Sequence, residues 1–325
     1  MSVITQNSAL SWTEALKRLG FDGEAEVMGE VSQQNDFLDE CPFLPANQGI
    51  YNKQLQAKYL GKGAFSKAYG ATTPISSGTD EITEPVKLYE GDSNIDDRVL
   101  KGVDARKVRD SEDILNFNGL VQDWLYQLVY VDQGDYPDAF KGLYARRKTL
   151  STAKPYTVWG GSGTGSDVTS VLLFEFGPSG FYMTFPPDSG AAGFHNEDRG
   201  MHSLPVPSGS GNYWAWVRHF EIWAGIVLRN SRAFLRYANI ETAGASNTFS
   251  ASTFIKMKRE LPSVGRNAVA FANRTVMGQL DDLAYNKANI SYHLREIQGY
   301  GPITHCAGVP FRMYEPILDT ETAIS

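Results

Sequence analysis

The most regular alternation of apolar and polar side chains lies between Asn212 and Ile240. From residue 214 to 228 nearly every even position is apolar, with Arg218 as the exception, while the odd positions include His219 and Glu221. A period of two residues is typical of a strand that buries one face. About fifteen residues at about 3.3 Å each would span roughly 50 Å, more than most strands of globular proteins. The pattern therefore predicts an elongated body rather than a compact enzyme.

The far end of this segment has two interpretations. Either one very long strand runs through Gly225, or the glycine seats a bulge at which the strand bends. In both cases the polar residues 229–232 predict a turn into a second strand at 233–240. We therefore expect a long hairpin from Tyr213 to Ile240.

A long amphipathic helix is predicted at residues 110–131, ended by Gly134 and Pro137. Its apolar side chains recur three or four positions apart, at Ile114, Phe117, Val121, Trp124 and Leu128. Downstream, the apolar segments 168–176 and 180–185 flank a Gly-Pro-Ser turn, which predicts another hairpin. The remaining pattern is mixed: helices at 253–261 and 276–285, a strand at 268–272 and a strand-like segment at 304–318.

The amino-terminal third lacks a core of its own. A capping box at Ser11–Glu14 predicts a short helix through Leu19, and a second helix is expected from Gly23 towards Asp39. Residues 48–101 are interpreted as a projecting two-stranded loop with strand-like segments at 49–60 and 82–91. Because an isolated hairpin is only marginally stable in water, both the arm and the loop need another surface to lie against.

Composition narrows the classes of function. The 325 residues carry a formal net charge of −7, which argues against a dedicated nucleic-acid-binding protein. Basic side chains cluster at 101–109, 146–148 and 256–259. Solvated faces are the simpler interpretation of these clusters, and weak contact with nucleic-acid phosphates is the alternative.

Targeting and redox signals point to a reduced cytosol. Cys41 and Cys306 stand far apart, without a CxxC pair or neighbouring paired histidines, so neither a disulfide framework nor a zinc site is expected. The amino terminus has no basic segment followed by an apolar stretch, and no run of 18 apolar residues occurs. We therefore expect a protein that is neither secreted by that route nor membrane-spanning.

The candidate chemical motifs are incomplete. The glycine cluster at 160–165 lacks the signature of a phosphate-binding loop and is interpreted as a flexible turn, and no serine is centred in GxSxG. Residues 195–198, His-Asn-Glu-Asp, could supply part of a metal or acid–base site, but a surface loop is the preferred interpretation. His219 is interpreted as a hydrogen-bonded strand residue. We expect no catalytic residue, no cofactor and no metal.

Short motifs then follow one another along residues 140–325. They are GTGSD with TS at 163–170, FGP at 176–178, FP at 185–186, HNED before Gly200, WAGIVLR at 223–229, RYANI at 236–240, LPS at 261–263, NRTV at 273–276, GVPFR at 308–312 and ILDTE at 317–321. In this order they resemble the Hong Kong 97-type major capsid proteins of tailed bacteriophages. The resemblance is strongest to the short-tailed phage group that includes epsilon-fifteen.

The resemblance implies an α+β fold of the Hong Kong 97 type and a division of the chain. The expected parts are an amino-terminal arm at 1–45, an extended loop at 46–105, the spine helix of the peripheral domain at 106–135, a first part of the axial domain at 136–204, the long hairpin of the peripheral domain at 205–240, and the rest of the axial domain at 241–325.

The resemblance also implies a function. It implies a non-catalytic subunit that self-assembles into hexameric and pentameric capsomers of an icosahedral head around double-stranded DNA, which it contacts weakly and without sequence specificity. A scaffolding protein, a portal and a possible cement protein are the implied partners, within a virion assembled in the host bacterial cytoplasm. The alternatives are an encapsulin-like cellular shell protein of the same fold and a glycoside-binding or hydrolytic β-rich protein.

Candidate contacts between subunits come from the loop and the long strand. They are Lys53, Lys58, Lys62, Lys67, His219 and Glu221. Some relatives crosslink a loop lysine to an asparagine of a neighbour, but nothing in this chain demands such a bond, and we expect none.

Overall fold

The computed structural model describes residues 35–101, 104–150, 157–188, 193–206, 210–244, 246–263, 265, 267–285, 292–297 and 300–325, with the backbone alone at 284, 285, 292–297 and 300–303. The predicted helix at 11–19 and most of the predicted helix at 23–39 lie outside these residues. The end of the latter is present as the short helix α2 (Phe37–Glu40).

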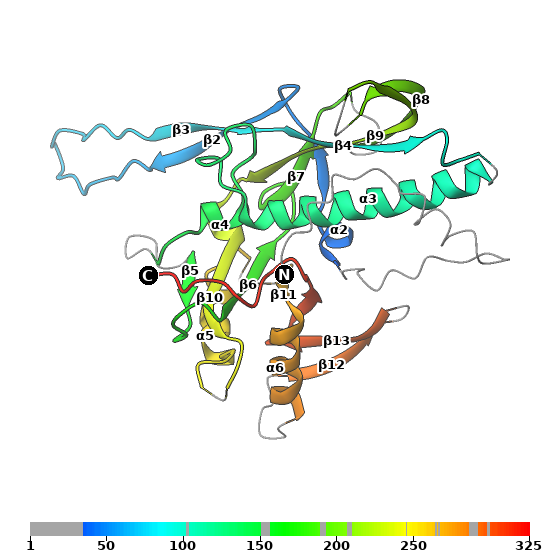
Figure 1. The fold of residues 1–325 in the computed structure, drawn as a ribbon. Coiled ribbons are helices and arrows are strands. Elements are labelled where there is room, and N and C mark those ends of the chain that lie inside the picture. Colours follow the sequence, from blue (N-terminus) through cyan, green and yellow to red (C-terminus); the bar gives the residue numbers. More distant parts are fainter. Residues whose placement is uncertain are drawn as a thin grey trace.

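A five-stranded sheet forms the thin end of the molecule, with the helix α3 (Ala105–Tyr130) lying along it (Figure 1). Its central strand is β9 (Asn212–Leu228), which pairs antiparallel with β8, β4 and β7. The other members are β1 (Phe43–Pro45), β4 (Lys87–Asp96), β7 (Phe181–Phe185) and β8 (Phe194–Pro205).

The long strand is a single element of 17 residues that runs through Gly225, where its strand partners change. Pairing with β4 ends at Ala224, and pairing with β7 begins at Gly225. A Cβ at Gly225 would lie 2.5 Å from the carbonyl oxygen of Pro85, which is closer than van der Waals contact allows. The absence of a side chain at Gly225 therefore allows the backbone at Pro85 to approach β9 closely.

The even positions of β9 face the helix, so the buried face predicted for the strand packs on α3. Phe220 packs on Phe117 of α3 with ring centroids 5.5 Å apart, and the Arg218 Nε lies 3.3 Å from an Asp113 carboxylate oxygen. The single charged residue in the apolar series is thus matched by a buried acid on the facing helix. Trp214, near the free end of the strand, is exposed.

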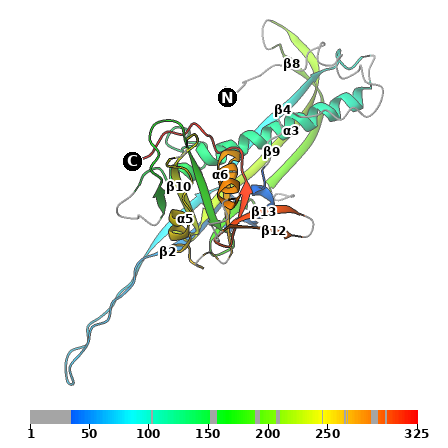
Figure 2. The same cartoon turned by 90° about the horizontal axis from the view of Figure 1, so that it is seen from below.

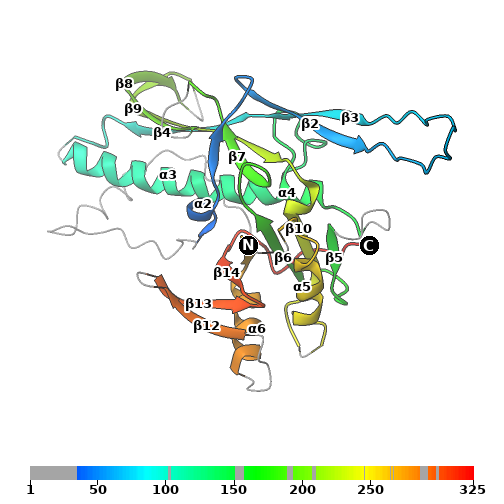
Figure 3. The same cartoon turned by 180° about the vertical axis from the view of Figure 1, so that it is seen from behind.

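A seven-stranded sheet forms the thicker end, where α5 (Ala251–Lys258) and α6 (Arg274–Tyr285) pack (Figure 3). Its strand order is β12 (Tyr292–Ile297), β13 (Tyr300–Cys306), β14 (Val309–Met313), β11 (Ala268–Ala272), β6 (Val168–Glu175), β10 (Phe234–Glu241) and β5 (Val158–Gly160). The predicted segment at 304–318 is therefore two elements, because Ala307 and Gly308 adopt positive φ angles and reverse the chain.

The central strand β6 is buried at every position except Glu175, because both of its faces are covered. Leu172 and Phe174 join the cluster that contains Trp124 and Leu128 of α3. Val171 and Leu173, on the opposite face, join the cluster that also contains Phe254 of α5 and Val276 of α6.

Both predicted hairpins are wrong in their pairing. Strand β9 does not pair with β10, because the one-turn helix η2 (Ser231–Ala233) carries the chain from the five-stranded to the seven-stranded sheet. The turn at 177–179 likewise separates β6 from β7, which lie in different sheets. Periodicity identifies a strand but not its partner, and in both cases the turn leads to the other layer. The hairpin partner of β9 is β8.

The predicted loop strand at 82–91 is also divided. Strand β3 (Gly78–Pro85) ends at a proline, which has no N–H for the ladder, and the chain re-enters the five-stranded sheet as β4. The predicted helix boundaries shift less. Helix α3 begins at Ala105 rather than 110, because the Asp104 carboxylate accepts a hydrogen bond from the Lys107 N–H and caps it.

A buried polar network holds the carboxyl-terminal segment on the body. The Glu321 carboxylate accepts hydrogen bonds from Tyr130, Tyr144 and Ser170 at 2.6–2.8 Å, and lies 3.1 Å from the Arg236 guanidinium. Both charged side chains are 4% exposed. Burial and the nearby carboxylate raise the pKa of both tyrosines, so each remains a neutral donor.

Replacing Glu321 with Gln should therefore destabilise the protein by about 3 kcal/mol, because the buried Arg236 charge loses its counter-ion. The measurement is chemical denaturation of unassembled protein. Glu81→Gln is the matched control: it removes the same charge from a side chain that is 56% exposed and paired only with Lys53, and its cost should stay within about 0.5 kcal/mol. Equal midpoints for the two variants would contradict the role given to the network.

Candidate subunit interface

A two-stranded hairpin leaves the body as a long projection (Figure 2). It consists of β2 (Tyr51–Tyr59) and β3, paired antiparallel from Tyr51 opposite Pro85 to Tyr59 opposite Gly78. It points away from the end of the molecule that carries β8 and the start of α3 (Figures 1 and 2). The predicted projecting loop is confirmed as a hairpin, with its second strand at 78–85.

The base of the hairpin is fixed to the body by buried polar contacts. Glu84 of β3 forms a two-pronged ion pair with Arg146 of α4 (Leu143–Arg146), with both N–O distances at 2.7 Å. Asn52 donates to the Tyr182 hydroxyl at 3.1 Å, and the Gln54 amide donates to the Leu228 carbonyl at 3.1 Å. The direction of the hairpin is thus set by strands of the five-stranded sheet.

The outer part of the hairpin exposes large apolar side chains. Phe65 and Tyr69 are fully exposed, and the others are between half and three-quarters exposed: Leu55, Tyr59, Leu60 and Ile75. Contiguous exposed apolar surface is typical of protein interaction sites. A two-stranded ribbon with no apolar layer beneath it also gains little from folding alone. Both arguments require a partner surface for this segment.

The predicted loop lysines are all on the hairpin. Lys53 and Lys58 form exposed ion pairs with Glu81 and Asp80 of the opposite strand, at 3.0 and 3.2 Å. Lys62 and Lys67 lie in the exposed connection between the strands. Their assignment as contacts between subunits stays a prediction.

His219 and Glu221 lie on β9, facing away from α3, and are bonded within the chain. The His219 Nδ1 lies 2.5 Å from an Asp92 carboxylate oxygen, and its Nε2 lies 2.9 Å from Glu221. The interpretation of His219 as a hydrogen-bonded strand residue is confirmed. Burial lowers the pKa of His219, but these two carboxylates raise it by more, leaving it above its ordinary value. A subunit contact at either residue stays a prediction.

Residues 195–198 are not the expected surface loop but part of β8. The sequence indicates a loop here because four polar side chains follow one another without an apolar residue between them, although the segment pairs with β9. Asp198 accepts from Arg109 of α3 at 2.7 Å and from the N–H of Gly200 at 2.9 Å, where the register shifts. Burial raises the pKa of this carboxyl, but the Gly200 N–H and Arg109 hold it below its ordinary value.

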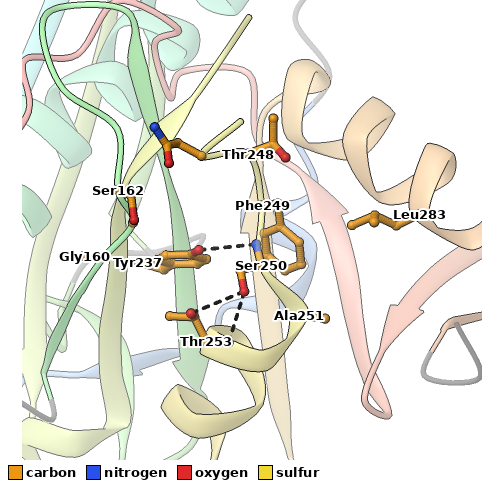
Figure 4. A pocket seen from close by; sticks show the side chains of 11 residues that line it. Gly160, Ser162, Tyr237, Thr248, Phe249, Ser250, Ala251, Thr253 and Leu283 are labelled. Atoms are coloured by element: carbon orange, nitrogen blue, oxygen red, sulfur yellow. Dashed lines mark hydrogen bonds between the residues drawn. The ribbon is translucent and has the colours of Figure 1, made fainter. Parts of the chain in front are cut away.

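The glycine cluster is a packing element rather than a flexible turn. A Cβ at Gly161 or Gly163 would lie 2.2 or 2.7 Å from the carbonyl oxygen of Asn239. The cluster borders a cavity of about 490 Å³ beside the start of α5, shown in Figure 4. Its lining contains Tyr237 and the helix-capping Ser250, and among the described lining residues none is charged. This cavity offers no acid–base pair.

All three predicted basic clusters are partly committed to internal bonds, since Arg109 of the first pairs with Asp198. Arg147 donates to the carbonyls of Ser231 and Phe234, and Arg146 holds Glu84. Lys258 donates to the carbonyl of Ala307 at 2.6 Å. Nothing in these contacts selects one cluster as a surface for nucleic acid. Within the part of the chain described, no helix is long and apolar enough to cross a membrane.

Comparisons with known proteins agree with the sequence resemblance. A family model described as major capsid protein GP7 matches residues 21–325. No curated protein matches the chain. A chain from the solved structure of bacteriophage epsilon15 is similar over 100% of this chain and 99% of its own, with 20% identity and a TM-score of 0.71. This likeness confirms the α+β fold of the Hong Kong 97 type.

Two further solved structures are less similar. The capsid of bacteriophage JBD30 covers 93% of this chain and 97% of its own, at 10% identity and a TM-score of 0.48. The SrpI encapsulin of Synechococcus elongatus PCC 7942 covers 73% of this chain and 98% of its own, at 8% identity and a TM-score of 0.47. The family match favours the capsid interpretation over the encapsulin-like alternative.

The Asp198–Arg109 pair should make a small, pH-dependent contribution to stability. Because the folded pKa is depressed, the contribution is present above the unfolded value, near 3.9, and is lost as the pH falls through the lower folded value. Asp198 is 41% exposed, so we expect Asp198→Asn to cost about 0.5 kcal/mol at pH 7 and less at pH 2. Denaturation midpoints of both proteins between pH 2 and 7 check this; a difference that grows towards low pH would contradict it.

Proposed function

The chain belongs to the major capsid protein GP7 family, and from that premise we propose that it forms the hexameric and pentameric capsomers of an icosahedral head. The observation that supports this most directly is the β2–β3 hairpin, which is anchored by buried contacts at its base and exposes Phe65 and Tyr69 at its outer part. The partner surface it requires is supplied by a second copy of the same chain.

The geometry favours head-to-tail contacts between copies. The hairpin and the end of the molecule bearing β8 point in opposite directions, so a hairpin that covers a neighbour leaves each copy with one donating and one receiving surface (Figure 1). Such heterologous contacts close into rings when the rotation between copies divides a full turn. Because each contact is repeated around the ring, individually modest contacts become collectively strong.

The expected parts of the chain fit this proposal, with two revisions. The extended loop at 46–105 contains the projecting hairpin and also β4, which belongs to the five-stranded sheet beside α3. The peripheral domain is assigned α3 with the β8–β9 hairpin, and the axial domain is assigned the seven-stranded sheet, which includes β10. The arm at 1–45 is assigned to contacts with neighbouring copies.

The remaining partners are proposed from the family membership and the charge. A scaffolding protein, a portal and a possible cement protein would assist assembly in the host bacterial cytoplasm. The packaged double-stranded DNA would be contacted weakly, since a net charge of −7 disfavours tight binding to phosphates. We assign the protein a structural, non-catalytic role.

Replacing Phe65 and Tyr69 together with Ser should abolish shell formation while leaving the fold intact, because both side chains lack contacts that the body needs. Electron microscopy of the expressed protein, with scaffold where assembly requires it, gives the readout, and circular dichroism verifies the fold. Tyr136→Ser is the control, since this residue is exposed but is not part of the hairpin. If the double variant formed shells at wild-type yield, the role proposed for the hairpin would be contradicted.

The subunits should remain without covalent crosslinks. Lys53 and Lys58 are paired with acids of their own hairpin, and Lys62 and Lys67 lie in its exposed connection. Purified particles, boiled in denaturant and run on a gel, should give a single band at the mass of the 35.9 kDa chain. A ladder of covalent oligomers would show that one of these lysines does react.

A further inference from the structure

A cluster of titratable side chains lies on the outer face of the five-stranded sheet, away from α3. Glu90 of β4 is directly opposite Glu221 of β9, and Asp92 is opposite His219. On the other side of β9, His195 of β8 is opposite Glu221. Directly opposite residues of antiparallel strands share a face. Three neighbouring strands thus bring two histidines and three carboxylates together.

The central histidine is buried and oriented. The His219 side chain is 7% exposed, and its Nδ1 is bonded to Asp92. A carboxylate only accepts hydrogen bonds, so in the neutral ring the Nδ1 carries the proton and the Nε2 presents its lone pair. That lone pair points at two further acceptors, Glu221 at 2.9 Å and Glu90 at 3.6 Å. A neutral ring therefore leaves three electron-rich atoms facing one another without a cation.

We propose that Glu90, His219 and Glu221 bind one divalent transition-metal ion of the zinc type. One imidazole nitrogen and two carboxylate oxygens lie within 4.8 Å of one another. Tetrahedral zinc with bonds near 2.0–2.1 Å places its ligands about 3.3 Å apart, and the two measured distances from the Nε2 fall on either side of that value.

The surrounding residues support the ligands as an outer shell does in metal sites. Asp92 fixes the tautomer of His219, and the Trp223 indole donates to the second oxygen of Glu221 at 2.8 Å, which leaves the first oxygen directed at His219. Glu197, opposite His219 on β8, is drawn instead towards Arg199 at 3.5 Å. His195 lies opposite Glu221 on the same face, outside the set of three ligands.

The ligand types decide the class of metal. Magnesium and calcium prefer sites built only from oxygen, whereas imidazole suits zinc and its neighbours in the first transition series. A bound ion would join β4 to β9 on the face of the sheet that points away from α3. The role of the ion is therefore structural: it would hold these two strands together, at a site separate from the hairpin interface.

Zinc titration by calorimetry tests the proposal with the full-length chain, free of any affinity tag and first treated with a chelator. We expect one zinc ion per chain and a rise in the thermal unfolding temperature. Glu90→Gln and Glu221→Gln should each weaken binding at least ten-fold, whereas Glu81→Gln on the hairpin should leave it unchanged. Both ligand variants keep the size of the side chain, and circular dichroism verifies their folding.

Cobalt substitution supplies an independent readout. Cobalt bound by the wild-type chain should give the visible absorption of a four-coordinate ion, and Glu221→Gln should lose it. Wild-type protein that binds zinc no more tightly than Glu221→Gln, or that binds magnesium as tightly as zinc, would overturn the proposal.

Discussion

The packing of β9 on α3 is the contact on which the rest of the structure depends. Three strands of the sheet pair with β9. Strands β8 and β4 pair with its first part, and β7 pairs with its far end. Its even positions meet the helix through Phe220 and Arg218. The same helix also packs Trp124 and Leu128 into the central cluster. Strand β9 and helix α3 therefore extend the core from that cluster into the thin end of the molecule.

The two sheets are joined by aromatic packing rather than by shared strands. Phe181 of β7 lies 4.7 Å from Phe174 of β6 and 6.2 Å from Phe234 of β10, measured between ring centroids. Phe37, from the segment that follows the arm, packs 5.6 Å from Phe174. Such ring pairs add to the energy of burial, typically by about 0.5–1.5 kcal/mol each. The chain leaves one sheet and enters the other at 177–179 and 229–232, and this packing holds the two sheets together at those crossings.

Sequence periodicity predicted the elements and not their partners, and the reason is physical. The alternation along β9 reports that one face is buried, and the three- and four-residue spacing in 110–131 reports a helix stripe; both are local properties. Pairing is not local. The polar residues 229–232 are as compatible with a tight hairpin turn as with a crossing between the two sheets. Only the burial of both faces of β10 distinguishes the turn from the crossing. The His219 cluster was missed for a related reason, since Glu90 and His219 are far apart in sequence and meet only through the register of β4 on β9.

The β2–β3 hairpin has no apolar core of its own, yet its direction relative to the body is fixed. Its base is fixed by three polar contacts with the body, of which the Glu84–Arg146 pair is nearly buried at 11% and 10% exposure. Its outer part has exposed rings and only exposed ion pairs, which contribute little to stability. Fixing the direction of a binding segment before it meets its partner reduces the entropy lost on association. The buried base therefore favours the contact that we propose for the far end, because it confines the exposed rings to one region beside the body.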